Sequence, residues 1–276
     1  MGFRYTPVTP HSTMASDANA GSCCPPGSWG DLQDSSDVAN QAGTALALHT
    51  GTSVYVTPAN PTGTPPSRVV VMASDVFGVG GRRPRLADYI AHATQAQVLL
   101  VDFQRTQTAA SAKNIKEYIK QFPWTAIEED VNATFEHVKQ VAASDAKIAA
   151  VGLCWGVWAA AQMSAQGYPL IAIAGPHPSL HIEGFAFGRD TLDLVKAIKC
   201  PTLLLPAGND PPEFQEDGEA SNYLREAFPN KSKVVAFPHM KHGWTARGDF
   251  AEPNVKEDTI KALQIITTWL NERFED

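Results

Sequence analysis

Residues 147–161 read KIAAVGLCWGVWAAA. The apolar half before Gly152 predicts a short buried strand, and the small residues after Gly156 predict a helix. The turn between them has the form Gly-x-Cys-x-Gly, which is a nucleophile elbow with Cys154 where serine is better known. Such a turn strains its central residue and crowds the crossing, so glycines are expected on both sides. The thiol then lies above the sheet at a helix N-terminus, where the dipole favours the thiolate.

The same five residues also fit a buried structural cysteine in an ordinary turn, so the neighbouring sequence has to decide. A continuous apolar run at 68–73 predicts a strand buried on both faces. The other predicted strands after it are 98–103, 147–153, 170–174, 202–206 and 233–237. The predicted helices are 84–95, 126–143, 155–166, 191–198, 217–228 and 254–274.

Ahead of these units, residues 44–49 and 53–57 alternate around Gly51 and predict an antiparallel hairpin. A hairpin followed by repeated strand–helix units predicts the α/β class. We expect a mostly parallel twisted sheet with an antiparallel N-terminal hairpin and helices on both faces.

The chain has 276 residues, of which 43% are hydrophobic, enough for a sizeable core. Residues 1–22 are polar, rich in Pro, Ser, Thr and Ala, and without periodicity, so they predict a disordered leader. They lack the patterns of a cleaved targeting peptide. Because no internal repeat or second boundary is visible, residues 23–276 are expected to form a single domain.

A formal net charge of −7 argues against nucleic acid or an anionic membrane surface as a partner. Apolar runs are all shorter than the ~18 residues that a membrane span requires. Four scattered cysteines do not make a disulfide framework, which favours a reducing, cytoplasmic compartment. No metal site is expected at Cys23 and Cys24, because neither His nor Cys stands at ligand spacing nearby.

A cysteine nucleophile needs a base, and that base needs an acid to orient it. In sheets of this type these partners follow later strands, in the order nucleophile, acid, histidine. Asp210 lies in the Asn-Asp-Pro-Pro loop after the strand at 202–206 and is the candidate acid, although this is also ordinary turn chemistry. Three carboxylates farther along compete for the role: Glu213, Glu216 and Asp217.

The candidate base is His242, after the strand at 233–237, with His239 as its competitor. We favour His242 because Gly243 next to it lets the backbone pass close to the elbow, and because His239 falls nearer the strand end.

The loop after the strand at 68–73 supplies a further expected element. In this architecture it donates one backbone N–H to an oxyanion hole, and the residue after the nucleophile donates the other. We assign these donors to Val76 and Trp155. Asp75 would then sit beside the thiol of Cys154, although a turn carboxylate is an equally good interpretation.

Together these features resemble the dienelactone hydrolase family, over about 23–274, and the opening at Cys23 resembles its eukaryotic branch. The motifs that carry the resemblance are Asp75-Val76-Phe77-Gly78, Arg85 with Ala87-Asp88, Asp102-Phe103, Gly152-Leu153-Cys154-Trp155-Gly156, His177-Pro178-Ser179, Asp210 and His242-Gly243-Trp244.

The resemblance implies an α/β-hydrolase fold, no cofactor, and a Cys154–His242–Asp210 triad. It also implies that an acidic residue at position 75 holds the resting thiol and helps to ionise it. The family often has Glu there, and Asp75 is one methylene shorter.

Substrate recognition is the last expectation that the resemblance carries. It implies arginines for a substrate carboxylate, for which Arg105 and Arg247 are the nearest candidates. His177 and Ser179 follow the strand at 170–174 and could line the pocket or serve the structure alone.

The resemblance therefore implies a hydrolase that opens a small lactone or ester, of the carboxymethylenebutenolide type, through an acyl-thioenzyme. We expect a monomer or weak homodimer. Two alternatives remain at this point: an acyltransferase that uses the same triad, and a non-catalytic member of the fold that binds a small molecule.

Overall fold

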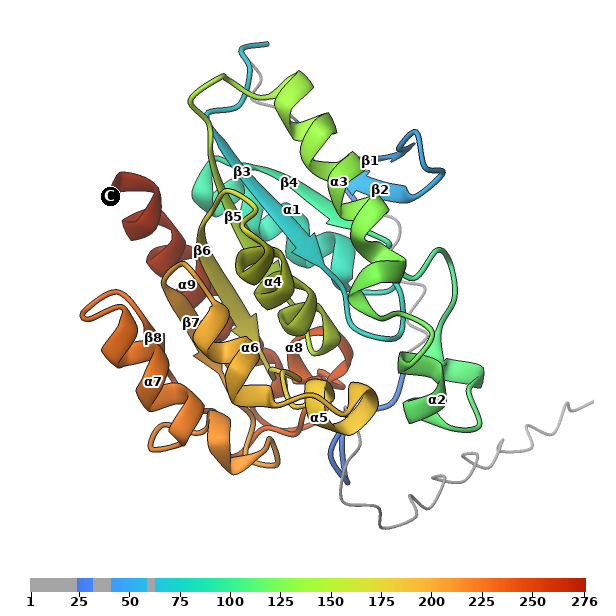
Figure 1. Ribbon diagram of the computed structural model, residues 1–276, viewed down its shortest axis with the longest axis vertical. Helices are drawn as coiled ribbons and strands as arrows, with labels where there is room; N and C mark the ends of the chain where they lie inside the picture. Colours follow the sequence, from blue (N-terminus) through green and yellow to red (C-terminus); the bar gives the residue numbers. More distant parts are fainter. Residues whose placement is uncertain (1–23, 32–40, 59–62) are drawn as a thin grey trace, which may run out of the picture.

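The computed structural model describes residues 24–31, 41–58 and 63–276, so the predicted leader and Cys23 lie outside the described residues. One eight-stranded sheet forms the centre, in the order β1-β2-β4-β3-β5-β6-β7-β8 (Figure 1). The strands are β1 (Thr44–Ala47), β2 (Ser53–Val56), β3 (Arg68–Ala73), β4 (Gln97–Val101), β5 (Lys147–Gly152), β6 (Leu170–Pro176), β7 (Thr202–Leu205) and β8 (Lys233–Val234).

The two N-terminal strands are antiparallel and the rest of the sheet is parallel. β1 pairs with β2 and β2 with β4 in antiparallel ladders, whereas β4-β3-β5-β6-β7-β8 all run the same way. The predicted fold class is therefore confirmed, including the hairpin at the start.

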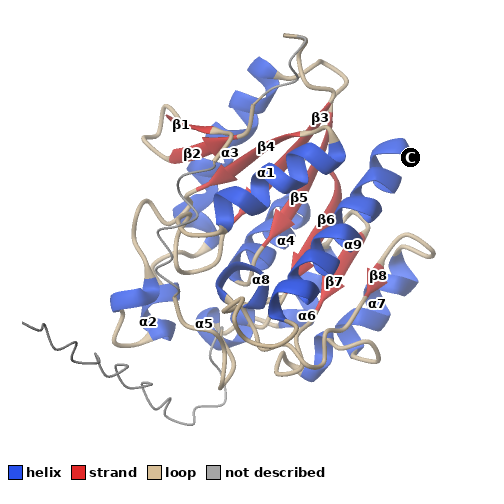
Figure 2. Cartoon of the chain, turned by 180° about the vertical axis from the view of Figure 1, so that it is seen from behind, coloured by secondary structure: helices blue, strands red, loops and turns tan. Residues whose placement is uncertain are grey.

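Helices cover both faces of the sheet. They are α1 (Arg83–Thr94), α2 (Ile115–Ile119), α3 (Trp124–Val141), α4 (Trp155–Gln166), α5 (Ile182–Phe187), α6 (Thr191–Ala197), α7 (Glu219–Ala227), α8 (Trp244–Arg247) and α9 (Val255–Glu275). α3, α4 and α6 lie in front of the sheet in Figure 1, and α1 and α9 pack together on the opposite face, in front in Figure 2.

The central strand β3 shows how the two faces are specified. Val69 and Val71 point into the core under α3 and α4, whereas Val70 and Met72 point into the core under α1 and α9. All four side chains are at most 1% exposed. A strand with both faces buried needs an unbroken apolar run, which is why this segment does not alternate with polar residues.

The structure departs from the predicted elements mainly at short ones. β8 has only two residues, although Phe237 still bridges Ala207 and the N–H of Val235 donates to Leu204. Pro206 has no N–H to give, which leaves this edge ladder incomplete. Helices α2, α5 and α8 were not predicted, because elements of four to six residues carry too little periodicity to be read.

No helix in the described part of the chain is both long enough and apolar enough to span a bilayer.

Candidate active site

The candidate residues meet because five parallel strands end at one edge of the sheet. Asp75 follows β3, Cys154 follows β5, and His177 follows β6. Asp210 follows β7, and His242 lies in the loop after β8. The carboxyl edge of a sheet of this kind is the place where ligands bind.

The turn at Cys154 is strained in the way expected of a nucleophile elbow. Its φ and ψ are 55° and −113°, and it caps the start of α4. A Cβ on Gly152 would lie 2.3 Å from the backbone of Gly156, and one on Gly156 would lie 2.1 Å from the carbonyl oxygen of Ala73. Both glycines are therefore required by close backbone approach, since contacts below 3 Å force the chain to move.

The sulfur of Cys154 lies in a fully buried position. The hydroxyl of Ser179 donates to Sγ at 3.3 Å, and the Ser179 N–H donates to the Cys154 carbonyl at 3.2 Å. Ser179 therefore fixes both the elbow backbone and the sulfur, a role that sequence reasoning did not separate from simple pocket lining.

The imidazole of His242 and the carboxylate of Asp210 form a short buried pair. His242 Nδ1 and Asp210 Oδ1 are 2.5 Å apart, and both side chains are 0% exposed. Asp210 Oδ2 accepts the N–H of Ala207 at 2.7 Å, and Asn209 Oδ1 accepts the N–H of His242 at 2.7 Å. A ring nitrogen of His242 and Sγ of Cys154 lie within 4.8 Å of each other. The three side chains thus lie next to one another in the order that the predicted triad requires.

Two opposing effects set the charge of His242. Burial alone would lower its pKa, but the Asp210 carboxylate and then the Cys154 sulfur raise the pKa of His242 well above 6.5. The imidazolium form is therefore favoured near neutral pH, beside a sulfur that can carry the matching negative charge.

The competing acids and base lie in more open positions. Glu213 is half-buried, and Glu216, Asp217 and His239 are exposed. Glu216 Oε1 accepts the N–H of Ala236 at 3.3 Å. Among all these candidates the short buried contact belongs to Asp210 and His242.

One assigned oxyanion donor begins α4 directly after Cys154, and the other lies in the loop after β3. Trp155 is the first residue of α4, a position whose N–H has no acceptor inside the helix. Val76 is fully buried, its carbonyl accepts the N–H of Ala109, and the N–H of the next residue, Phe77, donates to Asp75 Oδ1. The backbone of this loop is thereby fixed on both sides of Val76.

Asp75 has two buried arginine partners. Arg83 approaches both of its carboxylate oxygens, at 2.8 to 3.0 Å, and Arg247 Nε lies 3.0 Å from Oδ2. The three side chains are at most 2% exposed. The sequence did not predict the role of Arg83, because no sequence pattern indicates that a side chain in the first turn of a helix will contact the preceding loop.

Arg247, expected to bind substrate, is built into this buried cluster. Besides its ion pair with Asp75, Arg247 donates a hydrogen bond to the carbonyl of Trp29 and lies over the ring of Phe77, 4.5 Å from the centroid. Gly243 has a φ of 90°, and a Cβ there would lie 2.3 Å from Arg247 Nη2. The positive φ is what favours glycine at position 243, and the group nearest to it in space is the Arg247 guanidinium rather than the elbow.

Arg105, the other expected substrate arginine, is half-exposed and paired with a buried carboxylate. Its Nε and Nη2 donate to the two oxygens of Asp130 at 3.0 and 2.8 Å. Arg105 side-chain exposure is 50%, against 1% for Asp130. This pairing raises the pKa of Arg105, so its charge is permanent.

His177 lies against His242, the candidate base. Its ring packs edge-on to His242 at 5.0 Å and to Trp244 at 5.2 Å, and its Nε2 is 2.6 Å from the Thr245 hydroxyl. Burial, and next the charge on His242, lower the pKa of His177 well below 6.5. A neutral His177 can therefore support an imidazolium at His242 without repelling it.

The described N-terminal segment, residues 24–31, is hydrogen-bonded to the loops that carry Asn209 and His242. The Trp29 N–H donates to the His242 carbonyl at 3.0 Å, and Asn209 Nδ2 donates to the Pro26 carbonyl at 3.1 Å. This segment lies beside α8 at the bottom of Figure 1. It brings Cys24 to the site.

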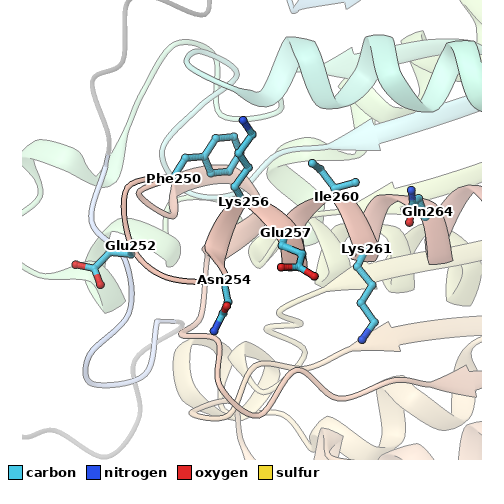
Figure 3. A pocket seen from close by; sticks show the side chains of 8 residues that line it. All are labelled: Phe250, Glu252, Asn254, Lys256, Glu257, Ile260, Lys261 and Gln264. Carbon is cyan, nitrogen blue, oxygen red and sulfur yellow. The ribbon is translucent and has the colours of Figure 1, made fainter.

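A separate hollow of about 550 Å³ lies beside the start of α9 and holds none of the candidate catalytic residues. Figure 3 shows Phe250 and Ile260 among its lining side chains. Both are partly exposed, at 38% and 42%, and Arg82 lies over the Phe250 ring. Its lining residues fall between Phe250 and Gln264.

The fold and the strand–elbow–helix turn define an α/β hydrolase. The model of the dienelactone hydrolase family matches residues 53–274, and the chain belongs to that family. At the level of the family it is a hydrolase of esters or lactones. No curated protein matches the chain.

Solved structures agree on the fold. A candidate dienelactone hydrolase from Klebsiella pneumoniae has 17% identity and a TM-score of 0.63, covering 82% of this chain and 96% of that one. A dienelactone hydrolase-like promiscuous phosphotriesterase from metagenomic libraries has 16% identity, a TM-score of 0.58, and coverages of 82% and 97%. Carboxyl esterase 2 from the fungus Tuber melanosporum has 13% identity, a TM-score of 0.57, and coverages of 90% and 92%.

Proposed function

We propose that the chain is a cysteine-dependent hydrolase that opens a small lactone or ester through an acyl-thioenzyme. One observation carries this proposal: the strained Cys154 elbow lies beside the buried His242–Asp210 pair. Within that pair, Nδ1 of His242 and Oδ1 of Asp210 are 2.5 Å apart. A structural cysteine has no need of a histidine whose pKa is raised by a buried carboxylate.

In the acylation step Cys154 Sγ attacks the carbonyl carbon of the substrate. The carbonyl oxygen becomes an oxyanion, which the N–H groups of Val76 and Trp155 stabilise. When the tetrahedral intermediate collapses, the carbon–oxygen bond of the ester breaks and His242 gives its proton to the leaving alkoxide. In a lactone the alkoxide stays attached, so the acyl-thioenzyme carries the opened chain.

In the deacylation step the now neutral His242 removes a proton from water, and the hydroxide attacks the thioester. Collapse releases the carboxylic acid and restores the Cys154 thiolate beside the His242 imidazolium. Asp210 holds Nδ1 of the ring throughout, which keeps Nε2 directed to the reacting atoms.

We further propose that Asp75 acts by positioning, through the loop that carries Val76. Its carboxylate binds the Phe77 N–H and two arginines, so it fixes the backbone of the proposed oxyanion donor. Arg105 remains the proposed contact for a substrate carboxylate, whereas Arg247, which is 1% exposed and paired with Asp75, is proposed to hold the same loop in place. A cytoplasmic location belongs to the same proposal, because a thiol nucleophile must stay reduced.

The decisive experiment is a screen of aryl esters and small carboxylated lactones against the purified protein, with Cys154→Ala and Cys200→Ala in parallel. Cys200 is a matched control, since burial raises the pKa of its thiol to about 11. We expect turnover in the wild type and in Cys200→Ala, with the acyl group found by mass spectrometry on the peptide containing Cys154. Turnover that survives in Cys154→Ala would show that the mechanism is wrong.

The same assay separates hydrolysis from acyl transfer. Added alcohols or amines compete with water for the acyl-thioenzyme, and the product ratio gives the preference. A wild-type protein that binds these compounds without turning any over would instead support the non-catalytic alternative.

A further inference from the structure

Three soft metal ligands meet at the catalytic site. Sγ of Cys24, Sγ of Cys154 and a ring nitrogen of His242 all lie within 4.8 Å of one another. Cys24 is half-buried, and the other two are fully buried. They come from distant parts of the chain, so ligand spacing in the sequence could not reveal the group.

The position of Cys24 is fixed by the same loops that hold the catalytic pair. Asn209 binds the carbonyl of Pro26 with its Nδ2 and the N–H of His242 with its Oδ1. Trp29 bonds to the backbone of His242 and accepts from Arg247. Cys24 therefore belongs to a segment that is bound to the site at several points.

The donor set matches zinc. Two thiolates and an imidazole select Zn²⁺ over the hard cations, and three protein ligands leave the fourth tetrahedral position for water. With Zn–S of about 2.3 Å and Zn–N of about 2.0 Å, the ligand atoms of such a site stand roughly 3.5–3.8 Å apart. A separation of at most 4.8 Å needs only about 1 Å of closure, which side-chain rotation at Cys24 can provide.

Asp210 prepares His242 for this role. It occupies Nδ1 at 2.5 Å, so Nε2 is the nitrogen left for a metal. A histidine that donates its other N–H to a carboxylate is the usual arrangement at protein zinc sites, where the carboxylate orients the ring and increases its basicity. Asp210 therefore orients His242 in both roles, as the proposed base in hydrolysis and as the proposed metal ligand.

We propose that Zn²⁺ binds at Cys24, Cys154 and His242 and blocks the active site. Binding replaces the proton on Nε2 of His242 and the thiol proton of Cys24, so it releases protons and strengthens as the pH rises. The metal occupies the nucleophile and the base together, so the bound form cannot attack a substrate. Removal of the metal restores both groups.

Cobalt spectroscopy tests the site without reference to activity. The full chain, kept reduced with a phosphine and checked for intact thiols, is titrated with Co²⁺ and then with Zn²⁺. We expect one equivalent of Co²⁺ to give tetrahedral visible bands and sulfur-to-cobalt charge transfer, and Zn²⁺ to remove both. Cys24→Ser should weaken the thiolate band to about half and lower the Zn²⁺ affinity at least tenfold.

Cys23→Ser and Cys200→Ser are the controls and should bind as the wild type does. Cys24→Ser with unaltered affinity, or a loss that follows Cys23→Ser instead, would overturn the three-ligand site. So would a wild-type protein that gives no tetrahedral cobalt spectrum.

Hydrolysis supplies a second measurement. We expect Zn²⁺ to inhibit the wild type and a chelator to restore it, with the inhibiting concentration at least tenfold higher in Cys24→Ser. Each variant is compared with itself with and without metal, so a change in its basal rate cancels. Equal inhibition of Cys24→Ser and wild type would contradict the proposal. A protein without esterase activity would refute the proposed function, while the cobalt titration would still decide the metal site.

Discussion

Two buried aspartates lie at the same edge of the sheet and face opposite kinds of partner. Asp210 pairs with a histidine, and Asp75 pairs with two arginines. All the side chains involved are at most 2% exposed, so burial does not distinguish the two groups. The partner does: an imidazole exchanges its proton near neutral pH, and a guanidinium does not.

The difference between the partners predicts that Asp210 takes part in proton transfer and that Asp75 holds neighbouring loops together. The Asp210 group can change charge during a reaction, because His242 can receive and give a proton. The Asp75 group joins the loop after β3 to the start of α1 and to α8. We therefore expect the two aspartates to respond differently when each is changed to asparagine.

The largest effect is expected on turnover in Asp210→Asn. The amide favours the wrong tautomer of His242 and removes the charge that stabilises the imidazolium, so kcat should fall on the order of 10³–10⁴-fold. The fold should survive, as seen by circular dichroism. Glu213→Gln, on the same loop, should stay within a few-fold of wild type. If Glu213→Gln is the damaging change, the acid has been placed on the wrong residue.

The second effect is expected on stability in Asp75→Asn. It leaves Arg83 and Arg247 buried without a negative charge, and breaking a buried ion pair from one side costs about 3–5 kcal/mol. Urea unfolding measures this loss of free energy. Glu117→Gln is the control, because its pair with Lys120 is exposed and should change the free energy of unfolding by less than about 1 kcal/mol. A free energy of unfolding in Asp75→Asn equal to that of the wild type would contradict the structural role of the buried cluster.

The local signals were the ones that sequence could predict. Gly152 and Gly156 predict the elbow, because the backbone crowding that requires glycine there arises in part between residues close in the sequence. The parallel sheet followed from the order of strands and helices, and the same order brings Asp210 and His242 to one edge of the sheet. Arg83 and Cys24 were missed, because their contacts depend on the folded arrangement of loops and follow no sequence pattern.

The third prediction concerns the protonation of His242. Its pKa lies well above 6.5 because Asp210 and Cys154 outweigh the opposing effect of burial. A raised folded pKa adds stability that is fully present below about pH 6.5 and is lost as pH rises through the folded value. Asp210→Asn should lower the pKa of His242, and so shrink this stability and move the loss to lower pH.

Histidine NMR across a pH series measures this shift directly, with urea unfolding at each pH as the companion measurement. His239 is exposed and serves as an internal control in the same spectra. A His242 resonance that titrates at the same pH in wild type and Asp210→Asn would contradict the assignment of Asp210 as the partner that sets its charge.

The smallest effect is expected at Arg105, and it brings substrate charge into the comparison. Arg105 is half-exposed and already shares its guanidinium with Asp130, so a contact to a substrate carboxylate there is partly screened. Arg105→Gln should raise KM for a carboxylated lactone by only about 2- to 10-fold, below the 1.5–3 kcal/mol of a fully desolvated charged hydrogen bond. For the neutral ester p-nitrophenyl acetate it should leave KM unchanged.

Arg247→Gln is the matched contrast, because Arg247 is bonded to Asp75 inside the buried cluster. Its loss should lower kcat/KM on charged and neutral substrates alike, through displacement of the loop that carries Val76. A charge-dependent effect at Arg247 would show that it reaches the substrate as well as Asp75. If Arg105→Gln affects both substrates equally, Arg105 stabilises its loop through Asp130 and does not contact the substrate carboxylate.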